Sequence, residues 1–259
     1  MRQLRRRHLS TDRWPEGYAR KILTRTDSTN AEAARLAPVS SGPIWILAHE
    51  QQAAKGRRGR LWSMPKGNFA ATLLMHPTEK PGVVALRSFV ASLALFDALV
   101  AVSGRSEPFS LKWPNDVLLS GQKLAGILLE SIGSGTGVQH LAIGIGVNLA
   151  SAPDIHEVEA EALRPVALSL ALGVAVGPED FLILLAESYA KGENDFVTLG
   201  FAPIRHAWLE RAARLGEIIR ARTVTEEHIG RFETLDEDGN LVLGTANGRK
   251  HIPAAEVFF

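Results

Sequence analysis

The chain has 259 residues, 46% of them hydrophobic, and its 29 Lys and Arg against 28 Asp and Glu leave a formal charge of +1. This charge is too small to produce a global field that favours nucleic acid or a membrane surface. The absence of cysteine excludes disulfides, thiolate metal sites and a cysteine nucleophile, and it fits a reducing compartment. Size and composition are ordinary for a soluble globular protein with one large domain, or one large and one small domain.

Residues 1–20 contain a run of arginines without a following apolar stretch, so we expect a basic leader and no secretory signal. An organelle transit peptide is the alternative. The most apolar segment, Val83 to Val102, contains Arg87 and Asp97. Charges in that position are costly in lipid, so the segment predicts a buried core helix and no membrane span.

The first predicted helix follows a run of polar residues. A strand opens at Ile22 and Leu23, and Asp27-Ser28-Thr29-Asn30 then precedes a helix-forming stretch that ends at Ala37. Thr29 and Glu32 have capping-box spacing. These polar residues either cap the helix or bind a polar ligand at its N-terminus.

A basic loop, Gln51 to Trp62, lies between strands predicted at 44–50 and 68–76. It contains Lys55-Gly56-Arg57-Arg58-Gly59-Arg60. Glycine lets backbone N–H groups approach an anion, and arginine offers forked donors to phosphate or carboxylate. Taken alone, the loop is either a small-anion site or a solvated basic surface.

Three further strands are expected after the core helix. Residues 110–119 read as one strand interrupted at Pro114, which cannot donate to a ladder. A tight turn at 120–122 leads to a return strand over 123–130, and a third strand covers 140–149, so we expect an antiparallel meander. Glycine is unusual inside strands, and these strands contain Gly126, Gly144 and Gly146. The glycines indicate that a ligand or another backbone comes close, or that the strands have a packing kink.

The remainder of the chain predicts helices and then a small barrel. Helices are expected over 165–172, from Pro178 to about Lys191, and over 201–213. From Glu217 the pattern changes to period two, with turn signals at Asp236-Glu237-Asp238-Gly239 and Asn247-Gly248. The predicted organisation is a leader over 1–20, a catalytic domain over 21–213 and a β-barrel over 214–259.

The basic loop, Lys112 to Asp116, and Lys123 fall in one predicted sheet, and converging cations suit a reaction that develops negative charge on phosphorus. Together with other stretches, they resemble the biotin protein ligases. The matching stretches, in the order of the family, are 27–30, 51–60, Lys112-Trp113-Pro114-Asn115-Asp116, Lys123-Leu124-Ala125-Gly126-Ile127-Leu128-Leu129-Glu130 and Gly144-Ile145-Gly146-Val147-Asn148-Leu149. The resemblance covers about residues 20–259.

The resemblance implies an α+β fold, with a mixed, largely antiparallel sheet flanked by helices as in class II synthetase-like ligases, and an SH3-like C-terminal barrel. It implies that biotin is activated with ATP and Mg²⁺ to biotinyl-5′-AMP and then transferred to a lysine of a biotin carboxyl carrier domain. The acceptor would belong to acetyl-CoA carboxylase or a related biotin-dependent carboxylase. The implied protein is cytoplasmic, a monomer or weak homodimer, and binds neither DNA nor membrane.

The resemblance also implies roles for individual residues, which are carried over position by position. The catalytic residues are Lys123, Arg57 and Asp116, with Asp116 either orienting or deprotonating the acceptor amine, or serving as a cap or a Mg²⁺-shell group. The biotin-binding residues are Ser28, Thr29, Asn30, Gln51, Lys55, Gly56, Arg57, Lys123 and Gly126. The nucleotide-binding residues are Arg58, Arg60, Trp62, Lys112, Asn115 and Asn148. The ligands of the metal ion stay open.

Two departures from the family bear on these roles. Its loop usually reads Gly-Arg-Gly-Arg where this chain has Ala54-Lys55-Gly56-Arg57. Alanine does not readily take a positive φ and lysine lacks the forked donor, so we expect the loop to close differently. Some members also carry an N-terminal helix-turn-helix repressor domain, for which about 20 residues are too few. We therefore expect a monofunctional ligase of the bacterial type.

Two alternatives were considered. Lipoate ligases and octanoyltransferases share the superfamily, but the transferases work through a cysteine, which this chain lacks, and lipoate ligases carry an Arg-Arg…Gly-Gly-Gly run that is absent here. A nucleic-acid binder built on the basic loop and the barrel is the other class. The near-zero charge and the presence of only two tyrosines disfavour it.

Overall fold

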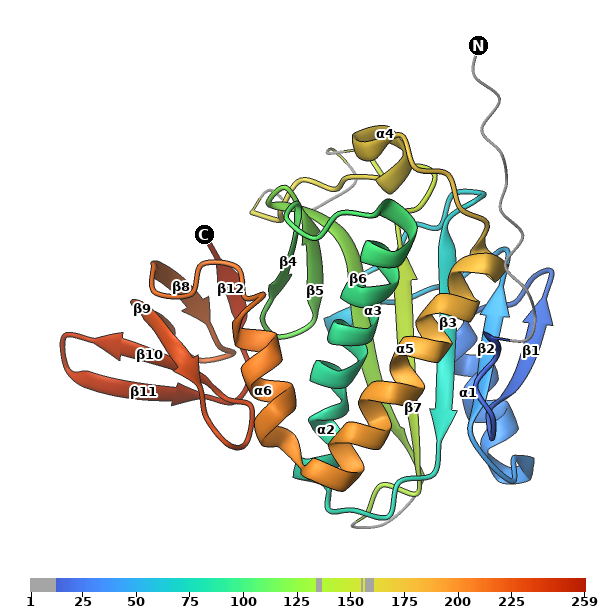
Figure 1. Cartoon of the computed structure of the whole chain (residues 1–259). Helices are drawn as coiled ribbons and strands as arrows, with labels where there is room; N and C mark the ends of the chain where they lie inside the picture. Colours follow the sequence, from blue (N-terminus) through green and yellow to red (C-terminus); the bar gives the residue numbers. More distant parts are fainter. Residues whose placement is uncertain (1–12, 134–136, 155, 157–160) are drawn as a thin grey trace.

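A computed structural model describes residues 13–133, 137–154, 156 and 161–259 of the chain. The larger body is a seven-stranded sheet covered by helices, and a smaller body of five strands lies at the left of Figure 1. The predicted fold class, α+β with a small C-terminal β-domain, is therefore confirmed. The arginines of the expected leader, at 2 and 5–7, lie outside the described residues.

The large sheet has the strand order β1-β2-β3-β7-β6-β5-β4. Its strands are β1 (Ala19–Leu23), β2 (Ile44–Ala48), β3 (Phe69–Met75), β4 (Phe109–Lys112), β5 (Asp116–Leu119), β6 (Gln122–Ile132) and β7 (His140–Val147). In this sheet β1 pairs with β2 in parallel, and each of the other neighbouring pairs is antiparallel. The basic loop thus connects two adjacent strands, β2 and β3, as predicted.

Helices cover both faces of this sheet (Figure 1). One face packs against α3 (Arg87–Ser103), α5 (Pro178–Leu199) and α6 (Phe201–Leu209), and the other against α1 (Thr29–Leu36). Shorter helices are η2 (Ala37–Val39), η3 (Arg57–Gly59), α2 (Pro81–Ala85) and α4 (Leu168–Leu172). Pro178 at the first turn starts α5, and Gly104 in the left-handed conformation (φ 69°) ends α3.

The apolar helical segment lies in the core, as predicted. By length and composition Pro81–Ser103 could cross a membrane, but 72% of its most apolar window is buried inside the protein. Arg87 in this segment is 3% exposed, and its guanidinium bonds to Glu193 and Glu79, each at 2.7 Å. The buried charge is thus paired, which offsets the cost of removing it from water.

The segment around Pro114 differs from its prediction. Residues 110–119 form two strands instead of one, because the chain reverses at 113–115 and β4 pairs antiparallel with β5. Lys112 pairs with Asp116 across this turn. The meander consequently has four strands, β4 to β7, and the reversal brings two charged side chains of one sequence motif to the same place.

Several boundaries and one cap also differ. The expected helix over 83–102 is divided into α2 and α3 at Leu86, α5 continues to Leu199, and α6 ends at Leu209. The capping box is wrong, because Ser28 is the N-cap and makes no side-chain cap bond. Thr29 bonds instead to Gln51, and Glu32 bonds to Lys21 and Arg35.

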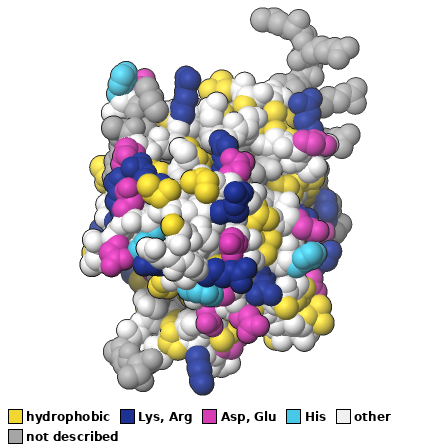
Figure 2. All heavy atoms as spheres, turned by 90° about the vertical axis from the view of Figure 1, so that its left-hand side faces the viewer, with side chains coloured by type: hydrophobic (Ala, Val, Ile, Leu, Met, Phe, Trp, Pro, Cys, Tyr) yellow, Lys and Arg dark blue, Asp and Glu magenta, His cyan; other side chains and the backbone are white. Residues whose placement is uncertain are grey.

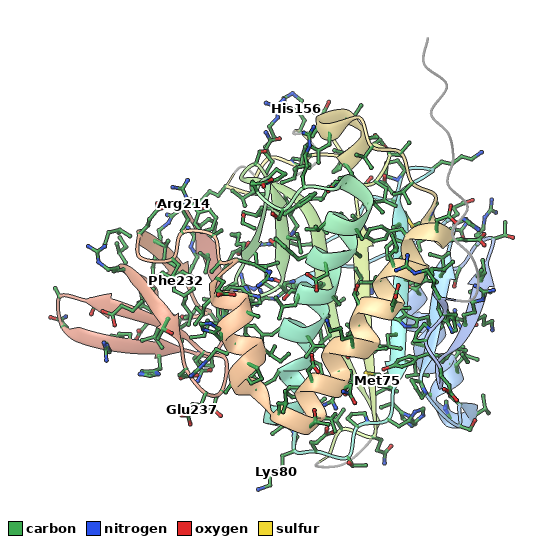
Figure 3. The ribbon with its side chains drawn as sticks, viewed as in Figure 1. Met75, Lys80, His156, Arg214, Phe232 and Glu237 are labelled. Atoms are coloured by element: carbon green, nitrogen blue, oxygen red, sulfur yellow. The ribbon has the colours of Figure 1, made fainter. Side chains whose placement is uncertain are left out.

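The smaller body is an antiparallel sheet in the order β11-β10-β9-β8-β12, here called the barrel. Its strands are β8 (Ile218–Arg222), β9 (Glu227–Leu235), β10 (Leu241–Thr245), β11 (Gly248–Ile252) and β12 (Glu256–Phe258). Phe232, labelled in Figure 3, is buried within it. Its turn at Gly239 docks on the larger body: Trp113 Nε1 donates to Gly239 O at 3.1 Å, and a Cβ there would lie 2.7 Å from Phe89.

Candidate active site

Three glycines form a strip on the α1-facing side of the sheet. Gly126 of β6 pairs with Gly146 of β7, and Gly144 lies two residues along β7 on the same face. A Cβ at Gly146 would lie 2.5 Å from the indole of Trp62, and one at Gly144 would collide with the Asn30 amide. The predicted close approach to these glycines is therefore real, but the approaching groups are side chains and not another backbone.

A hydrogen-bonded polar cluster, here called the amide pocket, covers the Gly144 end of the strip. Thr29 donates to Gln51 Oε1 from its backbone N (2.7 Å) and its hydroxyl (3.1 Å). Thr72 Oγ1 donates to Asn30 Oδ1 at 2.6 Å, and Asn30 Nδ2 donates to Glu130 Oε2 at 2.6 Å. Thr29, Asn30 and Thr72 are buried, so this network holds fixed donors and acceptors in a dry environment.

Two members of the amide pocket, Thr72 and Glu130, were missed as site residues. The available signal was Thr72, the one polar residue in the apolar strand Phe69–Met75. Ser28, predicted to bind biotin, is the N-cap of α1, and its backbone N–H donates to Asp27 Oδ1 at 2.8 Å.

A charged cluster, here called the cation cluster, lies at the Gly126 end of the strip. Asp116 is at its centre, with Lys123 Nζ 2.8 Å from Oδ1 and Lys112 Nζ 3.9 Å from Oδ2. Arg57 Nη1 donates to Asn115 Oδ1 at 3.3 Å. In the hairpin of β5 and β6, Lys123 pairs with Leu118 and Asp116 pairs with Gly126, and the Lys123 side chain reaches Asp116 along the same face. The predicted convergence of cations in this sheet is therefore what the structure shows.

Electrostatics in the cation cluster favour the ionised form of Asp116. Burial alone would raise the pKa of Asp116, but the charges of Lys123, Lys112 and Arg57 hold it below its usual value. Burial lowers the pKa of Lys112, and Asp116 partly offsets this effect. An ionised carboxylate that already bonds to Lys123 is a weak base, so Asp116 is better suited to hold and orient cations than to accept a proton.

Trp62 and Asn148 lie beside the two clusters. The Lys123 ammonium is 5.8 Å from the centre of the Trp62 ring, so the indole covers both the glycine strip and the cation cluster. Asn148 is buried just beyond β7, and its Oδ1 lies 3.5 Å from Asn68 Nδ2.

The arginine side chains of the basic loop lie in two different places. Arg57 is directed into the cation cluster, whereas Arg58 and Arg60 are exposed and bond to Glu256 of the barrel. Lys55 is also exposed. The left-handed residues of the loop are Arg58 (φ 58°) and Gly59 (φ 73°), while Ala54 is buried with its carbonyl bonded to Trp62 N.

Comparisons with known proteins agree with this geometry. Residues 22–148 match the Biotin/lipoate A/B protein ligase family, and residues 215–259 match the Biotin protein ligase C terminal domain. The chain is 58% identical to the Biotin--[acetyl-CoA-carboxylase] ligase of Paracoccus denitrificans, over 92% of this chain and 99% of that protein. The chain belongs to the biotin protein ligase family.

More distant members of the family share most of the chain. The Escherichia coli Bifunctional ligase/repressor BirA is 27% identical over 88% of this chain and 70% of its own length. The structure of the Aquifex aeolicus biotin protein ligase in complex with biotin and ATP superimposes with a TM-score of 0.77 and 26% identity, covering 92% of this chain and 97% of that one. These relatives span both bodies of the present biotin protein ligase.

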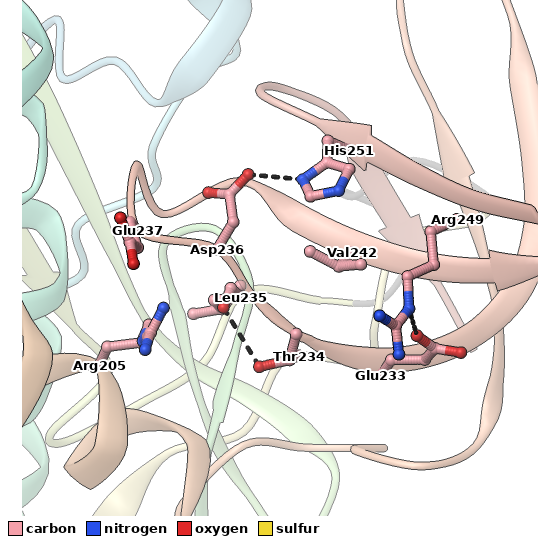
Figure 4. A pocket seen from close by; sticks show the side chains of 9 residues that line it. All are labelled: Arg205, Glu233, Thr234, Leu235, Asp236, Glu237, Val242, Arg249 and His251. Atoms are coloured by element: carbon pink, nitrogen blue, oxygen red, sulfur yellow. Dashed lines mark hydrogen bonds and ion pairs between the residues drawn. The ribbon is translucent and has the colours of Figure 1, made fainter.

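A separate hollow of about 460 Å³ lies between α6 and the barrel of this ligase (Figure 4). Its wall contains two pairs of polar side chains that bond to each other. His251 Nδ1 lies 2.7 Å from Asp236 Oδ2, and Arg249 Nε lies 2.6 Å from Glu233 Oε2. None of the predicted site residues lines it. The hollow is therefore distinct from the candidate active site.

Proposed function

We propose that this ligase activates biotin with ATP, forming biotinyl-5′-AMP and pyrophosphate, and transfers the biotinyl group to one lysine of a biotin carboxyl carrier domain. The observation that supports this most directly is the arrangement on one face of the sheet. The amide pocket and the cation cluster lie at opposite ends of a glycine strip. That arrangement suits a ligand with a neutral hydrogen-bonding head, an apolar chain and a carboxylate.

Biotin has these three parts in this order. Its ureido group has N–H donors and a carbonyl acceptor, which would bond with Thr29, Asn30 and Gln51 in the amide pocket. Its alkyl chain would lie along the glycine strip, where Trp62 packs directly against Gly146, so the indole would shift to admit the chain. Its carboxylate would then reach Lys123, with Gly56 and Lys55 in the loop above.

In the first step a carboxylate oxygen of biotin attacks the α-phosphorus of ATP, and the bond to the bridging oxygen breaks to release pyrophosphate. Both reactants are anions, so their approach is opposed by repulsion. Lys123, Lys112 and Arg57 would neutralise this charge and stabilise the transition state. Asp116 holds Lys123 and Lys112 on one side of the reacting atoms. Trp62, Asn115 and Asn148 would border the nucleotide.

In the second step the neutral ε-amine of the acceptor lysine attacks the acyl carbon, the bond to the phosphate oxygen of AMP breaks, and the nitrogen loses a proton. The low pKa of Asp116, held down by its three cations, favours a positioning role in this step. The Asp116 carboxylate would align the incoming amine, and solvent would take up the proton that the nitrogen loses.

Mg²⁺ would neutralise the triphosphate as it binds. Within the described residues no three His, Cys, Asp or Glu side chains come together as a metal site. The ion would therefore be carried mainly by the phosphates, as is usual for Mg²⁺ with nucleotides.

We further propose a cytoplasmic, monomeric or weakly dimeric enzyme that binds neither DNA nor membrane, since the sequence lacks cysteine and its net charge is +1.

The direct test is ATP–pyrophosphate exchange measured with biotin and, separately, with lipoate. We expect exchange with biotin and none above background with lipoate, because the amide pocket is matched to a ureido head. A purified carrier domain should then become labelled at one lysine. Exchange that depends on lipoate and ignores biotin would refute the assignment.

A glycine substitution tests the path of the biotin chain. Gly146→Ala places a Cβ 2.5 Å from the present position of Trp62, so the added methyl projects from the strip into the space that we assign to the ligand. The KM for biotin is expected to rise by about tenfold, which corresponds to a loss of about 1.4 kcal/mol in binding. Gly82→Ala is the matched control, since a Cβ there meets nothing within 4 Å. An unchanged KM in Gly146→Ala would place biotin elsewhere.

A further inference from the structure

Glu256 of the barrel forms ion pairs with both exposed arginines of the basic loop, Arg58 and Arg60. Arg60 bonds both carboxylate oxygens, through Nη1 at 2.6 Å and Nη2 at 3.0 Å, and Arg58 Nη1 bonds Oε2 at 3.0 Å. The partners are separated by almost 200 positions in the chain. This is the forked geometry with which arginine also binds phosphate.

The same strand region holds the rest of the loop. Arg57 Nη1 lies 3.4 Å from Ala255 O, next to Glu256, so all three arginines of the loop contact residues 255 and 256. Arg58 has φ 58°, a left-handed conformation that is uncommon for residues other than glycine. A backbone in this conformation needs support from its side-chain contacts, and Glu256 provides that support.

In the described part of the chain, the ion pairs between the barrel and Arg58 and Arg60 are made by Glu256. Figure 2 faces the barrel side, where acidic and basic side chains lie next to each other. Glu227 pairs with Arg222 at 3.2 Å and with Arg220 at 3.6 Å, both in the barrel itself. Glu256 is thus distinguished by its partners, since it joins the barrel to a loop whose other arginine lies in the cation cluster.

We propose that Glu256 is a built-in competitor of the nucleotide phosphates, which holds Arg58 and Arg60 until ATP displaces it. The inference rests on the proposed function, in which these two arginines bind the nucleotide. One guanidinium cannot present the same N–H groups to a carboxylate and to a phosphate at the same time. ATP binding must therefore break the contacts with Glu256, and the loop must leave the barrel as it closes over the site.

The charge of Glu256 opposes the nucleotide as well. Once its arginines turn to the phosphates, its carboxylate remains near the incoming negative charge without those partners. Removing the charge while keeping the shape should therefore make ATP binding easier. This expectation is the reverse of that for a residue which positions Arg58 and Arg60 for catalysis.

The test compares Glu256→Gln with Glu227→Gln, each of which removes one barrel carboxylate that pairs with two arginines. For Glu256→Gln we expect the KM for ATP in biotin-dependent exchange to fall about threefold to tenfold, as two partly exposed ion pairs no longer compete. Binding of a non-hydrolysable ATP analogue, measured by calorimetry, should tighten by the same factor. Glu227→Gln should leave both values unchanged.

Trypsin provides a measurement on the ligand-free protein. Its cleavage sites include the bonds after residues 57, 58 and 60, and cleavage there should be several-fold faster in Glu256→Gln than in the wild type or in Glu227→Gln. A KM for ATP that rises or stays the same in Glu256→Gln would overturn the proposal, even if the wild type catalyses exchange normally. Absence of exchange in the wild type would instead overturn the proposed function.

Discussion

Lys123→Ala is expected to lower biotin-dependent ATP–pyrophosphate exchange by about 10²- to 10³-fold, the usual cost of losing one preorganised group at a developing charge. The Lys123 ammonium lies 2.8 Å from Asp116 and 5.8 Å from the Trp62 ring centre. It is therefore held in place before substrate arrives, at the end of the glycine strip where the carboxylate should lie. The loss should appear mainly in kcat, because the charge that it neutralises increases in the transition state.

Lys250→Ala is the control, since Lys250 is an exposed lysine of the barrel. Circular dichroism should show an intact fold for both variants. When biotinyl-5′-AMP is supplied directly, Lys123→Ala should transfer biotin to the carrier with a much smaller defect, because that reaction omits the first step. Normal pyrophosphate exchange in Lys123→Ala would exclude Lys123 from the chemistry of activation.

Arg57→Gly is expected to release the activated intermediate. Arg57 is the loop arginine that reaches the cation cluster, where it contacts Asn115, and it also contacts Ala255 of the barrel. Without this side chain the loop loses its link between the two bodies and its charge opposite the adenylate phosphate. Free biotinyl-5′-AMP should accumulate at least about tenfold above the wild-type level, which corresponds to a loss of about 1.4 kcal/mol in retention.

The released intermediate can be followed by incubation with a bystander protein. Arg57→Gly should biotinylate lysines of serum albumin in proportion to time, whereas the wild type should label only the carrier domain. Arg105→Gly removes an exposed arginine after α3 and should behave as the wild type. A variant at position 57 that keeps its adenylate and labels only the carrier would assign retention to another part of the loop.

The parts of the fold that were predictable have strong local signals. The tight turn at 120–122 joins β5 and β6, and glycine in the strands at 126, 144 and 146 marked where other groups come close. The reversal at 113–115 was not predicted, because Pro114 explains an interruption in one strand as well as a turn between two. The C-terminal part of α5 was also missed, since the helix continues through Gly192 and ends only before Gly200, which has φ 77°.

The site was only partly predictable, because its polar contacts join distant segments. Lys112, Asp116 and Lys123 lie within two consecutive hairpins, so their convergence follows from short-range structure. Thr72 and Glu130 meet Asn30 across 42 and 100 positions, and only the fold brings them together. No sequence pattern predicts that Arg58 and Arg60 pair with Glu256. The assignment of these arginines to the nucleotide remains a prediction.

The docking of the barrel through Gly239 limits how members of this family can be recombined. Trp113 belongs to the turn that precedes Asn115 and Asp116, and its indole bonds the Gly239 carbonyl, while Phe89 fills the space that a side chain at 239 would need. A chimera that takes its barrel from another ligase would replace one half of this contact and shift the hairpin bearing Asp116. Functional chimeras should therefore exchange α3, the Trp113 turn and the Gly239 turn as a single block.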